Sequence, residues 1–82
     1  FRIYPNPSAG KVHCSLELET PAEVKLSVFS PEGRLIAKIY EGVLNNGIHT
    51  MDWDAAVNAG IYTIVLQAGN KPLSRKLIIT DN

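Results

Sequence analysis

The sequence has 82 residues, is 45% hydrophobic, and carries 8 Lys and Arg against 8 Asp and Glu. A chain of this length and apolar content forms one small globular domain rather than a disordered segment. Zero net charge argues against binding to nucleic acid and against a polybasic membrane patch. No apolar run approaches the roughly 20 residues of a membrane-spanning helix. The chain starts at Phe1 without a Met or a signal peptide, so we expect a fragment of a longer protein.

Apolar and polar residues alternate along most of the chain, and this period of two predicts β-strands. No stretch has the apolar spacing of an amphipathic helix. Turn-forming Gly, Pro and Asn residues separate the alternating runs. Counting a short first strand, the pattern predicts about seven strands, at residues 2–4, 12–19, 24–28, 35–40, 49–53, 62–67 and 73–80.

The same alternation predicts which side chains face the core. In the fourth strand we expect Leu35, Ala37 and Ile39 inside, and Ile36 and Tyr40 outside. In the seventh strand we expect the core-facing residues Leu73, Leu77 and Ile79. The sixth strand is apolar on both faces at Val65, which indicates a central position in a sheet.

The segments between the strands contain specific turn signals. Ser30-Pro31-Glu32-Gly33 is typical of a type I turn, and Gly69-Asn70 is a good hairpin connection. Asn58-Ala59-Gly60 offers residues that tolerate positive φ. Pro5 and Pro7 bracket Asn6 and predict an extended entry to the domain. Short strands at spacings near ten residues favour a two-sheet antiparallel sandwich, with a single curled sheet as the alternative.

The residues that most often bind metals are not predicted to converge. We expect His13 to be solvated on the polar face of its strand, and His49 to be half-buried beside Met51 and Trp53. Cys14 faces the opposite way from His13, so the two cannot chelate a metal ion, and no metal site is predicted. On the buried face, Cys14 should have a raised thiol pKa and low reactivity.

The sequence contains no convincing catalytic arrangement. Asp52 and Asp54 lie on one strand face and could do acid–base work or bind a hard cation. The simpler interpretation is that Asp52 faces water and that Asp54 ends the strand and caps the next turn with its side-chain oxygen. Without a nucleophile motif or a phosphate-binding loop, we predict no catalytic residue, no cofactor and no enzyme activity.

The aromatic residues suggest one binding hypothesis. Trp53 and Tyr62 are aligned with apolar neighbours and are expected in the core. Phe29 and Tyr40 lie on less apolar faces and are the better candidates for stacking on a sugar.

Five motifs follow one another in a fixed order between Tyr4 and Thr80. They are Tyr4-Pro5-Asn6-Pro7 followed by Gly10, then residues 24–34, residues 47–54, Gly60-Ile61-Tyr62, and residues 75–79. Together they resemble the type A C-terminal sorting domains of the type IX secretion system. The layout also resembles the immunoglobulin-like domain of flagellar hook-capping proteins. Many sorting domains finish with a basic or apolar residue, whereas this chain ends in Asp81-Asn82.

The resemblance implies an all-β, immunoglobulin-like antiparallel β-sandwich of about seven strands, with residues 1–82 as one C-terminal sorting domain of a larger secreted protein. It implies a non-catalytic module that directs its cargo across the outer membrane to the cell surface or the exterior. The implied partners are the secretion translocon, the surface-attachment machinery, which can remove the module, and an N-terminal cargo domain. An accessory spacer or glycan-binding domain of a secreted enzyme is the alternative. The implied recognition residues are Pro5, Asn6, Pro7, Gly10, Gly60, Tyr62, Lys76 and Leu77.

Overall fold

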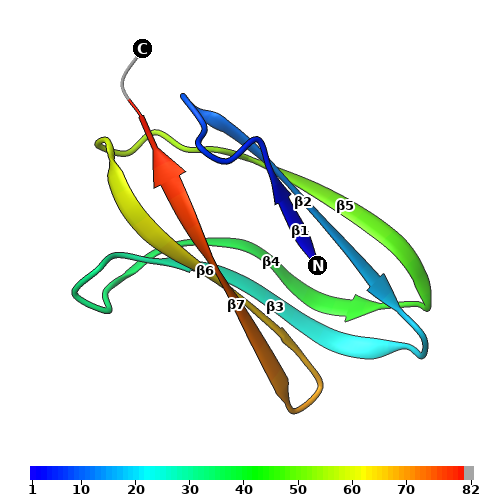
Figure 1. The fold of residues 1–82 in the computed structure, drawn as a ribbon. Helices are drawn as coiled ribbons and strands as arrows, with labels where there is room; N and C mark the ends of the chain where they lie inside the picture. The colour runs from blue at the N-terminus through cyan, green and yellow to red at the C-terminus, as the bar shows by residue number, and fades with distance from the viewer. Residues whose placement is uncertain (81–82) are drawn as a thin grey trace.

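The computed structural model of the protein describes residues 1–80, which form two antiparallel sheets packed face to face (Figure 1). One sheet has the strand order β1-β2-β5 and the other has the order β4-β3-β6-β7. The all-β sandwich is therefore confirmed, and the curled single sheet was wrong. No helix long and apolar enough to cross a membrane occurs in residues 1–80. The strands are β1 (Arg2–Tyr4), β2 (Lys11–Leu18), β3 (Ala22–Phe29), β4 (Leu35–Leu44), β5 (Gly47–Asp54), β6 (Gly60–Ala68) and β7 (Lys71–Ile79).

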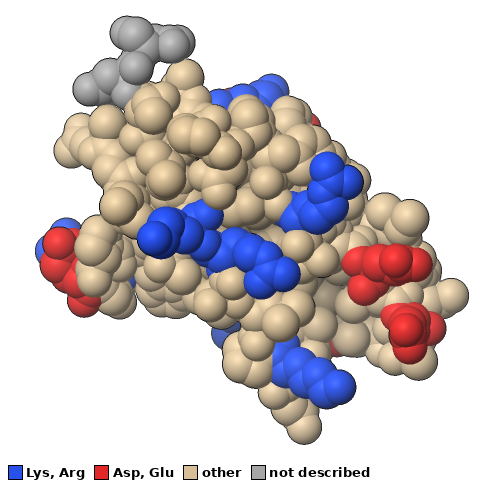
Figure 2. Space-filling view, in the orientation of Figure 1, with Lys and Arg blue, Asp and Glu red and all other residues tan. Residues whose placement is uncertain are grey.

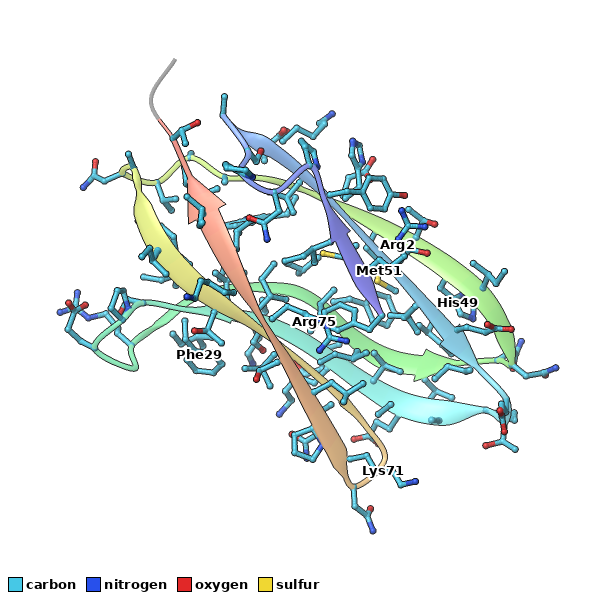
Figure 3. The ribbon with its side chains drawn as sticks, viewed as in Figure 1. Arg2, Phe29, His49, Met51, Lys71 and Arg75 are labelled. Carbon is cyan, nitrogen blue, oxygen red and sulfur yellow. The ribbon has the colours of Figure 1, made fainter. Side chains whose placement is uncertain are left out.

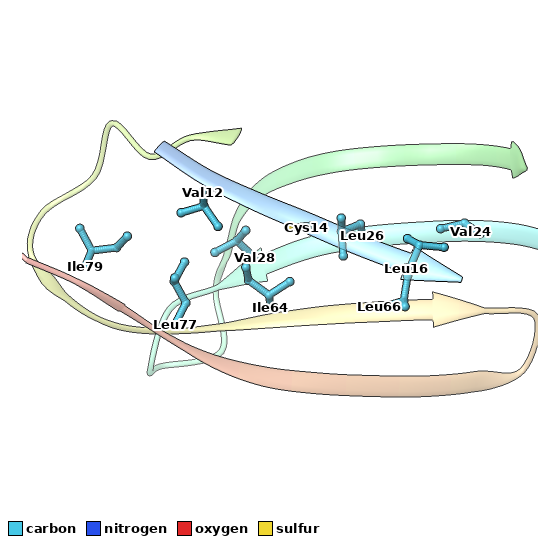
Figure 4. Packing of buried hydrophobic residues seen from close by; sticks show 10 residues of the cluster. All are labelled: Val12, Cys14, Leu16, Val24, Leu26, Val28, Ile64, Leu66, Leu77 and Ile79. Carbon is cyan, nitrogen blue, oxygen red and sulfur yellow. The ribbon is translucent and has the colours of Figure 1, made fainter. Parts of the chain in front are cut away.

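The core lies between the sheets and is built from alternating residues of β2, β3, β6 and β7 (Figure 4). Full burial of an aliphatic side chain of this size contributes about 1.5–3 kcal/mol, so this cluster is the main source of stability. The clean alternation in β2 and β3 matches the sequence pattern. The buried residues are Val12, Cys14, Leu16, Val24, Leu26, Val28, Ile64, Leu66, Leu77 and Ile79.

Strand β4 departs from the predicted alternation because it contains two β-bulges. Its register with β3 slips by one residue at Ile36 and again at Ile39. Each extra residue reverses the side of the sheet on which the following side chains lie. Leu35, expected inside, is consequently 46% exposed. Ile36 and Tyr40, expected outside, pack against the core instead.

Strands β6 and β7 form a hairpin whose far end has little cover. As predicted, β6 is central, between β3 and β7, and β7 is an edge strand. Leu77 and Ile79 are buried as expected, but Leu73 is 46% exposed. The register places Leu73 opposite the core residue Leu66, so it does face inward. It is exposed because the β6–β7 turn projects away from the three-stranded sheet (Figure 1).

The turns follow the sequence signals with one exception. The Gly33 N–H donates to the Ser30 carbonyl at 2.9 Å, which closes the predicted four-residue turn. Gly69 has φ +63° in the two-residue connection between β6 and β7, as the hairpin signal requires. The expectation for Asn58-Ala59-Gly60 was wrong, because none of these residues has a positive φ. The chain instead enters β6 at Gly60 in an ordinary strand conformation.

Replacing each of the two leucines of β7 by alanine should lower the free energy of unfolding by very different amounts. Leu77→Ala leaves a cavity in the core and should lower the free energy of unfolding by about 3 kcal/mol. Leu73→Ala, the matched control on the same strand, should cost less than about 1 kcal/mol because the side chain is half exposed. Urea unfolding of both variants measures the difference, and equal midpoints would show that the inner face of β7 is assigned incorrectly.

Candidate functional site

The N-terminal segment joins the two sheets at one end of the sandwich. After β1, the chain crosses to the outer edge of β7, where Ser8 forms a parallel bridge with Ile79 (Figure 1). The Ser8 N–H donates to the Ile78 carbonyl at 2.9 Å, and the Thr80 N–H donates to the Ser8 carbonyl at 2.8 Å. Residues 5–7 form bends, with both X–Pro peptide bonds cis. The predicted extended entry was therefore wrong, because the chain turns between its pairing with β2 and its pairing with β7.

Asn6 clamps the backbone of β7 through its side-chain amide. Its Nδ2 donates to the Lys76 carbonyl at 2.8 Å, and its Oδ1 accepts from the Ile78 N–H at 3.0 Å. An amide carries a donor and an acceptor side by side, as a peptide group does, so it can satisfy two backbone groups of an open strand edge. Asn6 and Lys76 are 70 residues apart in the sequence. The structure therefore unites the first and last motifs.

Ser8 completes the junction and was missed by the sequence prediction. Its side chain is buried, and its Oγ accepts from the Gly10 N–H at 3.1 Å and donates to the Lys11 carbonyl at 2.8 Å. The Gly10 carbonyl in turn accepts from the Ala55 N–H at 3.0 Å. A Ser two residues before a Gly is a local signal for such a side-chain turn. That signal was available in the sequence and would have identified Ser8.

Gly60 and Tyr62 form a second support on the neighbouring strand. The Tyr62 hydroxyl donates to the Asn58 carbonyl at 2.7 Å. A Cβ at Gly60 would lie 3.8 Å from the Tyr62 ring, in ordinary contact. The ring therefore folds back along the chain past Gly60 and fixes the entry into β6. Tyr62 packs against the core but remains partly exposed, so its predicted core position is confirmed only in part.

The remaining predicted recognition residues divide between surface and core. Pro5, Pro7 and Lys76 are exposed. Leu77 is fully buried and pairs with Tyr62 in the β6–β7 ladder. A partner can therefore contact the two prolines, the lysine and the edge of β7. Leu77 is not accessible, and its burial in the core anchors β7. The chain end at residues 81–82, where the sequence departs from the resembled pattern, lies outside the described residues.

The two aspartates are only partly as expected. Asp52 is exposed to water as predicted, but its Oδ1 also lies 2.6 Å from Nδ1 of His13. The reason is register, because the two residues are direct partners between β2 and β5. Asp54 ends β5 as predicted, but its backbone carbonyl, not its side chain, accepts from the Ala56 N–H at 2.9 Å. Within residues 1–80, no three His, Cys, Asp or Glu side chains are placed to hold a metal ion.

The aromatic residues do not build a stacking platform. Tyr40, expected at the surface, packs against the core because of the bulge beside it. Phe29 is half-buried on the outer side of β3 (Figure 3). Trp53 packs against the core at its margin, and His49 is half-buried as expected, with its Nε2 2.7 Å from the Asn45 carbonyl oxygen.

The buried thiol of Cys14 is a further confirmed expectation. Burial, with a smaller contribution from the negative charge of Asp52, raises the pKa of Cys14 from 9.0 to about 11. Both effects disfavour the thiolate, which is the reactive form.

Changing Asn6 to Asp tests the clamp with almost no change in shape. The carboxylate of Asn6→Asp can still accept from the Ile78 N–H but cannot donate to the Lys76 carbonyl, which it instead repels. We expect a loss of about 1 kcal/mol in unfolding free energy and faster hydrogen exchange at the Ile78 amide. Asn46→Asp, the same chemical change in the exposed β4–β5 turn, is the control. Identical exchange at Ile78 in both variants would contradict the clamp.

Cys14 should resist thiol reagents while the chain is folded. A pKa raised from 9.0 to about 11 lowers the thiolate fraction about hundredfold near neutral pH. Labelling should therefore be at least that much slower in buffer than in denaturant. The unfolded chain also loses the proton near pH 9 and the folded chain only near pH 11, so the free energy of unfolding falls as pH rises through this window. Rapid labelling of the folded chain would contradict this.

Comparison with known proteins agrees with the geometry. The family model described as "Secretion system C-terminal sorting domain" matches residues 2–80, which includes both halves of the Asn6–β7 junction. A search of curated proteins gave no match. The family is one of non-catalytic sorting domains, as expected for this chain. Its members carry cargo proteins across the outer membrane and interact with the secretion machinery. The chain belongs to the family of C-terminal sorting domains of the type IX secretion system.

Proposed function

We propose that the secretion machinery recognises this domain at the junction between the N-terminal motif and the edge of β7. The observation that supports this is the paired hydrogen bonding of Asn6 to the Lys76 carbonyl and the Ile78 N–H. The junction brings the opening motif beside the terminal one on an exposed surface. In this arrangement Asn6, Pro5, Pro7 and Lys76 present the surface.

The other predicted recognition residues have a supporting role in this proposal. Gly60 and Tyr62 begin the strand that pairs with the end of β7, and Leu77 anchors that end in the core. Gly10 closes the turn in which Ser8 is held. These internal contacts hold the edge of β7 rigid. A rigid edge loses less conformational entropy on binding than a mobile one, so the contacts favour recognition.

The proposal also assigns the rest of the polypeptide. The cargo is an N-terminal domain of the same, longer secreted protein, and the sorting domain is of type A. The surface-attachment machinery then removes the domain and links the cargo to the cell surface. A cut before β1 would release the cargo without crossing either sheet, because β1 is the first strand. The glycan-binding alternative has less support, since Tyr40 packs against the core and Phe29 is half-buried.

Export of a reporter tests the proposal in a host with this secretion system. We expect a reporter fused before residues 1–82 to reach the cell surface or medium, and deletion of residues 75–82 to abolish export. Asn6→Asp changes the recognised surface, and we expect it to reduce export about fivefold, which corresponds to a loss of about 1 kcal/mol in binding to the machinery. Asn46→Asp should leave export unchanged.

The point variants are needed because the deletion also removes two core residues, Leu77 and Ile79. A folded deletion protein that is exported normally would refute a role for the end of β7. Normal export of a folded Asn6→Asp protein would refute recognition at the junction, while leaving sorting by another surface intact.

A further inference from the structure

Basic side chains gather where the outer strands β1 and β7 lie on the same side of the sandwich (Figure 2). Within residues 1–80 this surface carries four exposed cations, Arg2, Lys71, Arg75 and Lys76, which we call the basic edge. The guanidinium of Arg75 in β7 lies 5.5 Å from the centre of the ring of Phe1, the residue that precedes β1. The chain has zero net charge, so the positive charge of this surface means that basic and acidic side chains lie on different parts of the molecule.

Carboxylates are missing from the strands that form this surface. Residues 1–16 and 55–80 contain no Asp or Glu, so β1, β6 and β7 supply none. Figure 2 shows the acidic side chains at the two flanks, away from the basic edge. Two of the lysines outside this surface, Lys25 and Lys38, lie beside the carboxylate of Glu41. Lys38 donates to Glu41 at 3.3 Å and lowers its pKa, with Lys25 3.7 Å away.

The backbone of β7 is open beside these cations. The groups at Ile78 and Thr80 that bind Asn6 and Ser8 show that even-numbered residues point their N–H and C=O outward. The same alternation directs the N–H of Ser74 and of Lys76 outward. Among the hydrogen bonds of residues 1–80, neither N–H is paired, and the Ser74 carbonyl is bonded only by the neighbouring Arg75 guanidinium at 3.0 Å. The outward groups from the Pro72 carbonyl to the Lys76 N–H are therefore an available half of the edge, whose other half begins at the Lys76 carbonyl and is closed by Asn6 and Ser8.

An apolar side chain also lies uncovered on this half. Leu73 faces the inner side of the sheet between Lys71 and Arg75 and is 46% exposed. A strand added beside β7 would cover it and would place its own alternate side chains near the flanking cations. A flexible polyanion such as a glycan or nucleic acid would use the cations but neither the backbone row nor Leu73.

We infer that residues 71–76 of β7 bind an extended acidic segment of a protein partner as an added strand. The two exposed N–H groups and the Ser74 carbonyl pair with the backbone of that segment, and its carboxylates lie against the basic edge. The inference deepens the proposed function by giving the chemistry of the partner, and it rests on that function only for the partner's identity as a component of the secretion machinery. Binding itself can be measured without secretion.

An NMR titration of the folded chain tests the inference with a defined probe. The probe is an acetylated, amidated peptide of sequence Glu-Thr-Val-Thr-Glu-Thr, about as long as a typical strand. We expect the amide signals of Ser74 and Lys76 to shift and the binding to weaken as salt is raised. The same peptide with Lys in place of Glu should bind at least about tenfold more weakly.

A pair of matched variants separates this surface from charge in general. Lys71→Glu with Lys76→Glu reverses two exposed side chains that make no side-chain hydrogen bond or salt bridge within residues 1–80, and should weaken binding at least about tenfold. Lys11→Glu with Arg34→Glu makes the same change of charge on β2 and in the β3–β4 turn, and should change binding less than about twofold. A probe with methylated backbone nitrogens should also bind weakly, because it cannot pair with an edge.

Three results would overturn the inference. The first is that the amide signals of Ser74 and Lys76 do not shift when the peptide is added. The second is that the two double variants bind the peptide equally well. The third is that the methylated probe binds as tightly as the unmethylated peptide, which would indicate a surface that binds polyanions without strand pairing. Export of the reporter then separates the two proposals. For export, Lys71→Glu is used alone, because Lys76 also belongs to the junction surface. If the Lys71→Glu fusion is exported normally while Asn6→Asp is not, recognition at the junction is supported and recognition through an acidic added strand is refuted. If the peptide binds while neither variant affects export, the edge is real but serves another partner.

Discussion

The hydrogen bonds between residues 6–8 and the end of β7 are the constraint on which the architecture of this domain depends. The Ser8 N–H pairs with Ile78 in β7, its carbonyl pairs with Thr80 just beyond the strand, and its hydroxyl closes the turn that leads into β2. Because Ser8 is 2% exposed, breaking this junction would leave buried polar groups without partners, which is more costly than losing an exposed hydrogen bond. One short segment thus ties a strand of the first sheet to an edge of the second.

The junction divides β7 into two parts with different properties. Its end is covered by Asn6 and Ser8 and anchored inside by Leu77 and Ile79. Its beginning is uncovered, and the lysines there discourage uncontrolled pairing with other edges. A partner that offers carboxylates along an extended backbone escapes this repulsion. The same charges therefore act against self-association and in favour of one class of partner.

The regular parts of this fold could be predicted from the sequence, and the irregular parts could not. Val12, Cys14 and Leu16 alternate without interruption and all lie in the core. The bulges at Ile36 and Ile39 left no mark on the apolar pattern, because both bulged residues are themselves apolar, so Leu35, Ile36 and Tyr40 were assigned to the wrong faces of β4. Asn6 was singled out through a family motif, yet its partner lies 70 residues away and no local rule relates the two positions.

The two halves of β7 differ in what a pairing partner would have to displace. A partner that pairs with the Lys76 carbonyl and the Ile78 N–H must displace Asn6, because that side chain already occupies both groups. The N–H groups of Ser74 and Lys76 and the Ser74 carbonyl can instead be paired without moving any part of the N-terminal segment. Cargo attached before Phe1 would therefore leave the open half of β7 accessible. The covered half becomes available only when the segment around Asn6 is displaced from β7. The N-terminal segment therefore determines how many backbone groups of this edge a partner can pair with.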